Sequence, residues 1–497
     1  MAAGLSTAPT RSATTTARRV LLTLSVGLLL LVGLSAPNAA QPDLAPRGWA
    51  PGTLLPLALG PAAVTAVLWL AYLAGGAAVL LGLRQRAAAL GSWAVPAGIG
   101  VLALLTAPFG SGDHVSYLAY GRILVTGGDP WVERPVDWGG GLDPVTSRVE
   151  APWTEEPSVY GPFGTLLHGL SALLGGDHLR QGVWAWQVLV VLAWLAVRAL
   201  LRRVLDDDAH GRIDVLWTLN PLVLGVGVLG AHIDVVAAAL VVAAVAVLRW
   251  RADAVGTAAA GALVALAGST KITYGVVAVG IVGAWWFTGT RGRALAQRTA
   301  ALVVGLVVVG GALQAWAGPH VYDQLLRSRQ AVSLATPWRP LLEWGRDMVG
   351  NAPTRLLISV AAALLAVALA ACLVRLTRPA AAHDPVAAAL WLTACLGFAY
   401  SLAAPYSLPW YDLLVWCALP AVAAGPVDVL ALLRLVALGL AYVPGRVLGM
   451  TPAVEDVTLG VRRGIVPWVG LALWVLVSVA GVRRGSWPRS GLPRRGR

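Results

Sequence analysis

Four ionisable side chains stand in one short stretch of the chain, GDHVSYLAYGRILVTGGDPW, between two long apolar runs; they are Asp113, His114, Arg122 and Asp129. Only 12% of the 497 residues are charged, so this concentration calls for a reason. An unpaired carboxylate can take a proton from a hydroxyl group, which makes Asp113 a candidate general base. The alternative is that Asp113 caps a helix N-terminus, a position that aspartate favours.

The spacing predicts a helix that starts near Asp113. On such a helix Ser116, Tyr117 and Tyr120 share the face of Asp113, while the apolar residues between them turn away. We expect this helix to lie in a membrane interface. The turn GGDPW follows it, and the Gly-rich apolar segment 160–176 predicts a re-entrant or interfacial helix.

Three further ionisable residues stand at the ends of apolar runs. His232 and Asp234 belong to the sequence GAHID, and Lys271, the single lysine of the chain, belongs to STK. An ionisable group beside the hydrocarbon region of a membrane is costly and usually marks a site. Each of them alone could cap a helix or reach into the interface, but together they favour one site shared with Asp113.

The composition indicates a membrane protein. The chain is 58% hydrophobic and carries a formal net charge of +13. Its arginines lie in short clusters between long apolar runs, which is typical of cytoplasmic loops and argues against nucleic-acid binding. Neither a disulfide framework nor a zinc site is expected, because the cysteines lie inside apolar runs without metal-like spacing; they are Cys372, Cys395 and Cys417.

We expect an all-α, polytopic integral membrane protein with about fourteen transmembrane helices. A transmembrane domain over 20–482 would be flanked by cytoplasmic tails at 1–19 and 483–497. The first span could instead be a cleaved signal peptide. The predicted spans are 20–36, 53–83, 91–108, 183–203, 213–230, 235–250, 254–270, 272–288, 299–317, 353–374, 386–404, 411–425, 427–443 and 465–482.

Arginine clusters recur at every second connection between these spans, and the positive-inside rule places those connections in the cytoplasm. The first large loop, 109–182, the Arg-rich loop, 318–352, and the loop 444–464 then face outside, together with GAHID, STK and 403–411. The ionisable residues named above therefore gather at the extracytoplasmic face of what we expect to be the plasma membrane. The cytoplasmic arginines are those at 11/18/19, 84/86, 198/202/203/212, 249/251, 291/293/298, 375/378, 434 and from 483 onward.

A carboxylate, a histidine and cations at this face suit a transfer from a lipid-phosphate donor. A sugar attached to phosphate already has a good leaving group, so the reaction needs a base for the acceptor hydroxyl and cations for the phosphate. Asp113 is expected as the catalytic base, with no metal and no other cofactor. A metal held by Asp113, His232 and Asp234 is the alternative, although His-x-Asp alone is a weak signal.

Cations and aromatic rings would complete the site. The phosphate is expected to contact Lys271, Arg122 and the arginines of the loop 318–352, which are Arg327, Arg329, Arg339 and Arg346. Aromatic side chains can stack on sugars, although at an interface they more often serve as anchors, as Trp131, Trp153 and Trp338 could. The predicted substrate-binding residues are His114, Tyr117, Tyr120, Arg122, Tyr160, His232, Asp234, Lys271, Arg339, Trp410 and Tyr411.

The order of these motifs resembles that of the GT-C glycosyltransferases that use polyprenyl-phosphate sugars. Asp113, the aromatic helix SYLAYGRIL, GGDPW and YGPFGTLLHGLSALL follow one another as in that family. With GAHID and STKIT, the match is closest to the actinobacterial polyprenol-phosphomannose-dependent α-(1→6)-mannosyltransferases. Asp113 matches the acidic catalytic residue of the family, and His232, Asp234 and Lys271 match polar positions of its outer face. Many relatives carry a second acidic residue where Val115 stands here.

The resemblance implies a hexosyltransferase that moves mannose from polyprenyl-phosphate mannose to a lipid-anchored mannan or lipomannan of the cell envelope. Attack by the acceptor 6-hydroxyl with inversion would form an α-(1→6) bond without a metal. Two other functions remain open. A flippase or transporter would carry polar residues at mid-membrane, in broken helices related by a repeat. A lipid-sugar polymerase or ligase would use several outer arginines, which the loop 318–352 offers.

Overall fold

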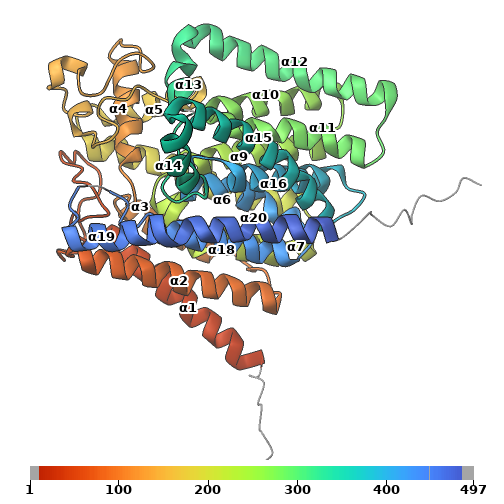
Figure 1. Cartoon of the computed structure of the whole chain (residues 1–497), viewed down its shortest axis with the longest axis horizontal. Coiled ribbons are helices and arrows are strands. Elements are labelled where there is room, and N and C mark those ends of the chain that lie inside the picture. The colour runs from red at the N-terminus through yellow and green to blue at the C-terminus, as the bar shows by residue number, and fades with distance from the viewer. Residues whose placement is uncertain (1–10, 329, 447, 484–497) are drawn as a thin grey trace, which may run out of the picture.

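The structure, a computed structural model, describes residues 11–328, 330–446 and 448–483. This part of the chain is helical throughout, with two isolated β-bridges and no strand. Its long helices lie side by side, and one hydrophobic core cluster runs through most of them (Figure 1). Residues 1–10 and 484–497, which make up most of the two expected tails, lie outside the described residues.

Eight helices of the described chain are long and apolar enough to cross a membrane. Six are single α-helices, and two are interrupted by π-helical turns. They are α1 (Arg11–Leu34), α2 (Pro61–Gln85), α6 (Leu179–Val204), Asp207–Leu229, α12 (Gly292–Ala317), α15 (Asn351–Leu376), α16 (Pro385–Ala403) and Pro452–Arg483. The interrupted ones consist of α7 (Asp207–Ile213), η3 (Asp214–Thr218), α8 (Pro221–Val223) and η4 (Leu224–Leu229), and of α19 (Pro452–Gly460), η9 (Val461–Ile465) and α20 (Val466–Arg483).

Five shorter apolar helices pack beside these spans. They are α3 (Ala94–Leu105), α9 (Asp234–Trp250), α10 (Ala254–Thr270), α11 (Val277–Phe287), which follows the short turn η5 (Ile272–Val276), and α18 (Pro426–Ala441). The all-helical, multi-pass class is thus confirmed, whereas the count of fourteen spans is not.

One predicted span, 411–425, is wrong. The chain there forms three short pieces, η7 (Pro409–Asp412), α17 (Leu413–Ala418) and η8 (Leu419–Ala421). Pro420 cannot donate a backbone hydrogen bond, and a helix that rises about 1.5 Å per residue is too short at this length to cross a membrane. The apolar side chains of these pieces are instead buried among the other helices. Two other boundaries also move, since α1 already begins at Arg11 and α2 begins only at Pro61.

The outer sides of α12 and α15 show how the chain meets lipid. Val304 and Val308 on α12 are 56% and 63% exposed, and Leu364 and Val367 on α15 are 68% and 71% exposed. Such continuous apolar surface is unfavourable in water and is stable against hydrocarbon. These helices therefore form part of the lipid-facing surface of the bundle.

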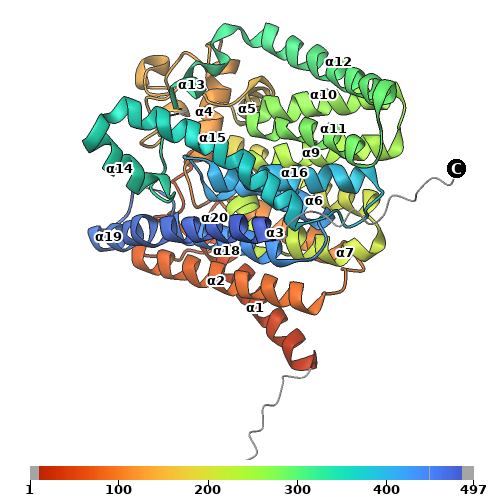
Figure 2. The same cartoon turned by 45° about the vertical axis from the view of Figure 1, so that its right-hand side comes forward.

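The small helices gather at one end of the bundle, on the left in Figure 1, and α14 and α19 are also on the left in Figure 2. They come from the three segments that we expect to share a face, namely 109–182, 318–352 and 444–464. The helix α7 lies at the opposite end. The small elements are α4 (Asp113–Val125), η1 (Trp138–Gly141), η2 (Thr146–Arg148), α5 (Pro162–Gly175), η6 (Pro319–Tyr322), α13 (Asp323–Ser328), α14 (Trp338–Val349) and α19.

The helix α4 is enclosed by protein, so the prediction that it lies in the membrane interface is wrong. Every residue from Asp113 to Gly121 is buried, because α5 and α6 pack on it. A Cβ atom on Gly121 would lie 2.2 Å from the carbonyl oxygen of His168 in α5, so this close crossing requires glycine. The helix α5 does expose one apolar side, with Leu170 and Leu173.

The arginine pattern predicts that Arg434 belongs to a cytoplasmic connection, and this prediction is wrong. It lies inside α18 and is buried. Its Nε donates to Asp412 Oδ1 at 3.0 Å, and its Nη2 donates to Ser407 Oγ at 2.6 Å. A buried carboxylate needs such a partner, and this requirement overrides the topology rule at one position.

The arginine alternation predicts that Leu142 lies outside the cell and Asp207 inside. The Leu142 residue is 87% exposed and the Asp207 side chain 99% exposed, whereas the three native cysteines are buried. In intact cells an impermeant thiol reagent should therefore label Leu142→Cys and leave Asp207→Cys unlabelled until the membrane is permeabilised. Labelling of Asp207→Cys alone would reverse the orientation.

Candidate functional site

Asp113 opens α4 and faces the turn 230–233 that precedes α9. One of its carboxylate oxygens lies 3.7 Å from His232 Nε2. Gly112, not Asp113, is the N-cap residue of α4, and the Asp113 side chain makes no capping hydrogen bond in the described chain. The capping interpretation of Asp113 is therefore wrong. Within the described chain its carboxylate accepts no hydrogen bond, which leaves its oxygens able to accept a proton from another molecule.

His232 is held in one tautomer. Its Nδ1 lies 2.6 Å from the carbonyl oxygen of Val226, which can only accept, so the ring proton is on Nδ1. Its Nε2 then accepts from Ser111 Oγ at 3.0 Å, and Ser111 Oγ accepts from the backbone N–H of Asp113 at 3.2 Å. These bonds fix the first turn of α4 against GAHID. Ser111 escapes the sequence analysis, although a serine just before a helix is a common local acceptor.

The pKa of Asp113 is raised to about 7, mainly because burial disfavours the charged form. The nearby charge of Lys271 lowers this pKa, and the charge of Asp234 raises it further. A carboxyl group with a pKa near neutrality suits a general base, because it is a stronger proton acceptor than an ordinary aspartate and is still deprotonated at neutral pH in part of the population.

Lys271 and Asp234 form an ion pair where α10 ends and α9 begins. Lys271 Nζ lies 2.7 and 2.9 Å from the two carboxylate oxygens of Asp234, which is fully buried. Tyr274 donates a further hydrogen bond to Asp234 Oδ1 at 3.1 Å. The Lys271 ammonium also lies 3.6 Å from the ring centroid of Tyr411. The partners of both charges are thus supplied inside the protein, as burial requires.

Two adjacent aromatic residues of η7 cover the two polar pairs, Asp113 with His232 and Lys271 with Asp234. The Trp410 ring is stacked on His232, with centroids 3.7 Å apart and 16° between the planes. Tyr411 covers Lys271, and the ion pair between Asp412 and Arg434 holds the end of the same turn. The structure therefore brings Asp113 together with five of the predicted substrate-binding residues, namely His232, Asp234, Lys271, Trp410 and Tyr411.

The turn YGP joins α5 to the end of α10. A Cβ atom on Gly161 would lie 2.2 Å from the carbonyl oxygen of Ser269, so glycine permits this approach. The backbone N–H of Phe163 donates to Ser269 Oγ at 2.9 Å. Since Lys271 follows Ser269 by two residues, this contact sets the distance between Tyr160 and the ion pair.

The tyrosines of α4 are buried beside the site and do not form an open surface for sugar. Tyr117 is fully buried and packs edge-on against Tyr160 at 5.0 Å and flat against His168 at 4.8 Å between ring centroids. The Tyr120 hydroxyl donates to the backbone carbonyl of Glu156 at 2.9 Å. The sequence pattern places these rings on the correct side of the helix, but neighbouring elements cover them.

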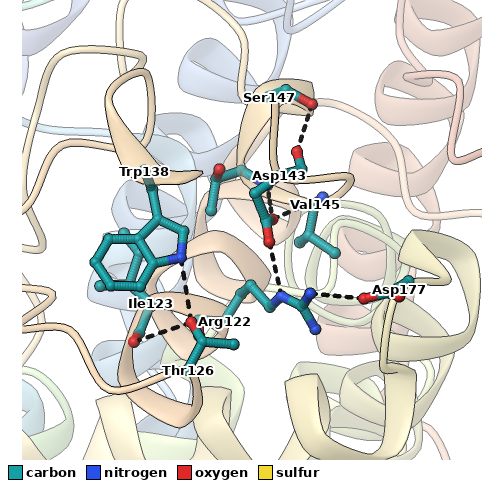
Figure 3. Close-up of polar contacts among 9 residues, drawn as sticks. Arg122, Ile123, Thr126, Trp138, Asp143, Val145, Ser147 and Asp177 are labelled. Atoms are coloured by element: carbon teal, nitrogen blue, oxygen red, sulfur yellow. Dashed lines mark hydrogen bonds and ion pairs between the residues drawn. The ribbon is translucent and has the colours of Figure 1, made fainter. Parts of the chain in front are cut away.

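Arg122 is not available to a phosphate. Its guanidinium lies between two carboxylates, with Nε 2.9 Å from Asp143 and Nη2 2.6 Å from Asp177 (Figure 3). Thr126, one turn further on, accepts a hydrogen bond from the Trp138 indole at 3.1 Å. The end of α4 therefore anchors the outer loop through Arg122.

Two other predicted binding residues lie in different surroundings, one paired at the surface and one buried. Arg339 on α14 forms an ion pair with Glu343 at 2.6 Å. His114 is fully buried, and in the described chain neither ring nitrogen has a hydrogen-bond partner. Burial, with the charges of Arg446 and Arg180, lowers the pKa of His114 to about 3, so the ring is neutral. Arg329 lies outside the described residues.

Metal binding finds little geometric support in the described chain. No group of three or more histidine, cysteine or acidic side chains there could hold a metal ion. The set considered from the sequence is not assembled, because both oxygens of Asp234 contact Lys271. Asp113 and His232 alone face each other.

Comparisons with known proteins point to one enzyme family. Residues 49–289, slightly less than half of the chain, match the family model described as alpha-(1->6)-mannopyranosyltransferase, N-terminal domain. This match confirms the resemblance seen in the motifs. It includes Asp113, His232, Asp234 and Lys271, and it ends before the loop 318–352.

Individual relatives carry the same description. Alpha-(1->6)-mannopyranosyltransferase B of Corynebacterium glutamicum is 27% identical over 47% of this chain and 39% of that protein. Alpha-(1->6)-mannopyranosyltransferase A of Mycobacterium tuberculosis is 29% identical over 37% of this chain and 34% of that protein. The matched regions thus span well under half the length of these relatives. Among solved structures, ArnT from Cupriavidus metallidurans bound to undecaprenyl phosphate aligns at a TM-score of 0.40 and 15% identity, covering 85% of this chain and 76% of that chain.

The ion pair of Lys271 and Asp234 should contribute to the free energy of unfolding. Lys271→Met leaves a buried carboxylate without its cation, and we expect a loss of about 3–5 kcal/mol in the free energy of unfolding. Adding Asp234→Leu removes the orphaned charge and should restore most of this loss. Thermal unfolding of the purified single and double variants measures both effects. Unchanged stability of Lys271→Met would show that the pair contributes nothing.

Proposed function

We propose that this protein is a GT-C membrane glycosyltransferase that transfers mannose from polyprenyl-phosphate mannose to a lipid-anchored mannan acceptor, forming an α-(1→6) linkage. The observation that carries the proposal is the Asp113 carboxylate, which is buried, accepts no hydrogen bond from the described chain and stands beside His232 and the Lys271–Asp234 pair. The similarity of residues 49–289 to the mannosyltransferase family supports the sugar and the linkage.

In this reaction Asp113 takes the proton of the acceptor 6-hydroxyl while the oxygen of that hydroxyl attacks C1 of mannose. The new C1–O bond forms as the bond between C1 and the phosphate oxygen breaks, and polyprenyl phosphate leaves with one additional negative charge. The proton remains on Asp113 and is later passed to water. Because attack and departure occur on opposite sides of C1, the β-linked donor gives an α-linked product.

The remaining groups of the site position these atoms. The hydrogen bonds from Asp113 N–H through Ser111 to His232 keep the base at a fixed place, since the first turn of α4 cannot shift without breaking them. A base that is already in place loses little entropy when the substrate binds. Asp234 and Lys271 act on the Asp113 carboxyl through their charges, and Trp410 and Tyr411 offer aromatic faces at the same place.

We place the reaction at the extracytoplasmic face of the plasma membrane. The segments that build the site alternate along the chain with the Arg-rich connections, which the positive-inside rule places in the cytoplasm. A transporter is less well supported. Its binding site should lie near mid-membrane, whereas the short helix α4, which Asp113 opens, lies at one end of the bundle (Figure 1). A lipid-sugar polymerase is less well supported, since two arginines of the loop 318–352, Arg339 and Arg346, contact acidic neighbours.

Replacing the proposed base tests its role. Asp113→Asn keeps the size of the side chain but removes its ability to accept a proton, so transfer should fall by about 100-fold or more while the protein still accumulates in the membrane. Transfer is measured with labelled polyprenyl-phosphate mannose and a short α-(1→6)-mannoside. Asp129→Asn is the matched control, because in the described chain the Asp129 carboxylate accepts one local hydrogen bond, from the Trp131 N–H, and this variant should retain most activity. Full activity of Asp113→Asn would remove Asp113 from the mechanism.

The raised pKa of Asp113 predicts how activity depends on pH. The reaction needs the carboxylate, so kcat/KM should rise about tenfold per pH unit below about pH 7 and level off above it. The sign for stability is opposite: protonated Asp113 is favoured in the folded state, and this stabilisation is lost as the pH rises through about 7. Lys271→Met should move the activity limb to higher pH, because the Lys271 charge lowers this pKa. A limb near pH 4 would contradict the assignment.

A further inference from the structure

The cations expected to bind phosphate are mostly paired. Lys271 contacts Asp234, Arg122 contacts Asp143 and Asp177, Arg339 contacts Glu343, and Arg346 contacts Asp347. Arg446 is likewise bound to Glu150. Arg327 is exposed and donates to Gln324. A leaving phosphate that gains negative charge needs a cation whose donors are still open and whose side chain is held near the site.

Arg462 has the properties that these residues lack. It belongs to η9, the π-helical turn between α19 and α20, a kind of irregularity that is frequent at functional sites. Its Nε donates to the carbonyl oxygen of Ala441 at 2.7 Å, and its guanidinium carbon lies 4.4 Å from the ring centroid of Tyr442. Within the described chain it forms no ion pair. The guanidinium is therefore half-buried and held in one orientation, while both of its Nη groups remain open.

Arg462 belongs to the same part of the molecule as the candidate site. Tyr442, which lies under its guanidinium, lines a pocket together with His232 and Trp410. Tyr406 lies in the loop before η7, and the charges of both Asp113 and Arg462 act on its phenol. Both the base and the guanidinium are thus near Tyr406, and Tyr442 connects Arg462 to the pocket that His232 and Trp410 line.

We propose that Arg462 binds the phosphate of the lipid-phosphate donor. This inference rests on the proposed function and names the group that holds its leaving phosphate. An arginine fork can donate two parallel hydrogen bonds to phosphate oxygens, and the Nη groups of Arg462 are the ones left for this task. Because Ala441 and Tyr442 already fix the side chain, little conformational entropy is lost on binding. As the C1–O bond breaks, the guanidinium faces the charge that develops on the phosphate.

Affinity for the leaving group alone tests this inference. Purified full-length protein should bind polyprenyl phosphate, and Arg462→Gln should weaken this affinity about tenfold or more, because hydrogen bonds to a charged group are lost. Arg463→Gln is the matched control: Arg463 is the exposed neighbour on the same turn and should leave the affinity unchanged. Neutral polyprenol should bind equally to all three proteins. Equal affinity of Arg462→Gln and Arg463→Gln for polyprenyl phosphate would overturn the inference.

A second measurement needs no variant. Phenylglyoxal modifies accessible arginines, and mass spectrometry reports each site separately. Micromolar polyprenyl phosphate should protect Arg462 and not Arg463 in the wild-type protein, whereas polyprenol should protect neither. Protection of Arg462 by inorganic phosphate at the same micromolar concentration would indicate a free-phosphate site and contradict the lipid source.

The same preparations separate this inference from the proposed function. A wild-type protein that transfers mannose while Arg462 reacts equally with and without polyprenyl phosphate would refute the role of Arg462 alone. A wild-type protein that neither transfers mannose nor binds polyprenyl phosphate would refute both. Transfer together with specific protection of Arg462 would support both.

Discussion

A charge buried inside a membrane protein must have a partner, and the Lys271–Asp234 pair meets this constraint at the centre of the candidate site. The single lysine of the chain ends α10, the aspartate begins α9, and contacts of 2.7 and 2.9 Å join them. Tyr274 and Tyr411 complete their surroundings. Because both charges are satisfied internally, they can stand close to Asp113 and act on its proton affinity without competing for the same substrate atoms.

The rest of the site is built by close approaches of backbone to this pair. Gly161 brings the YGP turn onto Ser269, next to Lys271, and Gly121 brings α4 onto α5. The neutral His232, fixed by Val226 and covered by Trp410, then receives the first turn of α4 through Ser111. In this arrangement Asp113 is buried by the packing of α4, and its carboxylate still accepts no hydrogen bond from the part of the chain that the structure describes. Such a group costs stability, which is acceptable where it serves a reaction.

Sequence patterns predict the helical membrane class and the residues that surround Asp113, because hydropathy and the ends of apolar runs report directly on the cost of burying charge. They do not reveal pairing. Arg122 and Arg339 look like available cations until Asp143, Asp177 and Glu343 fold onto them. Arg434 looks like a cytoplasmic arginine, although it serves Asp412. The sequence does not single out Arg462, which lies in a segment expected to be a loop, since a π-helical turn has no clear sequence pattern.

The central claim is that Asp113 serves the transfer of mannose from a lipid phosphate. The most direct measurement incubates purified wild-type protein and Asp113→Asn with labelled polyprenyl-phosphate mannose and an α-(1→6)-mannoside, followed by linkage analysis of the product. The account predicts an acceptor extended by one α-(1→6)-linked mannose with the wild-type protein and almost no product with the variant. Elongation by both proteins at the same rate, or by neither, would contradict it.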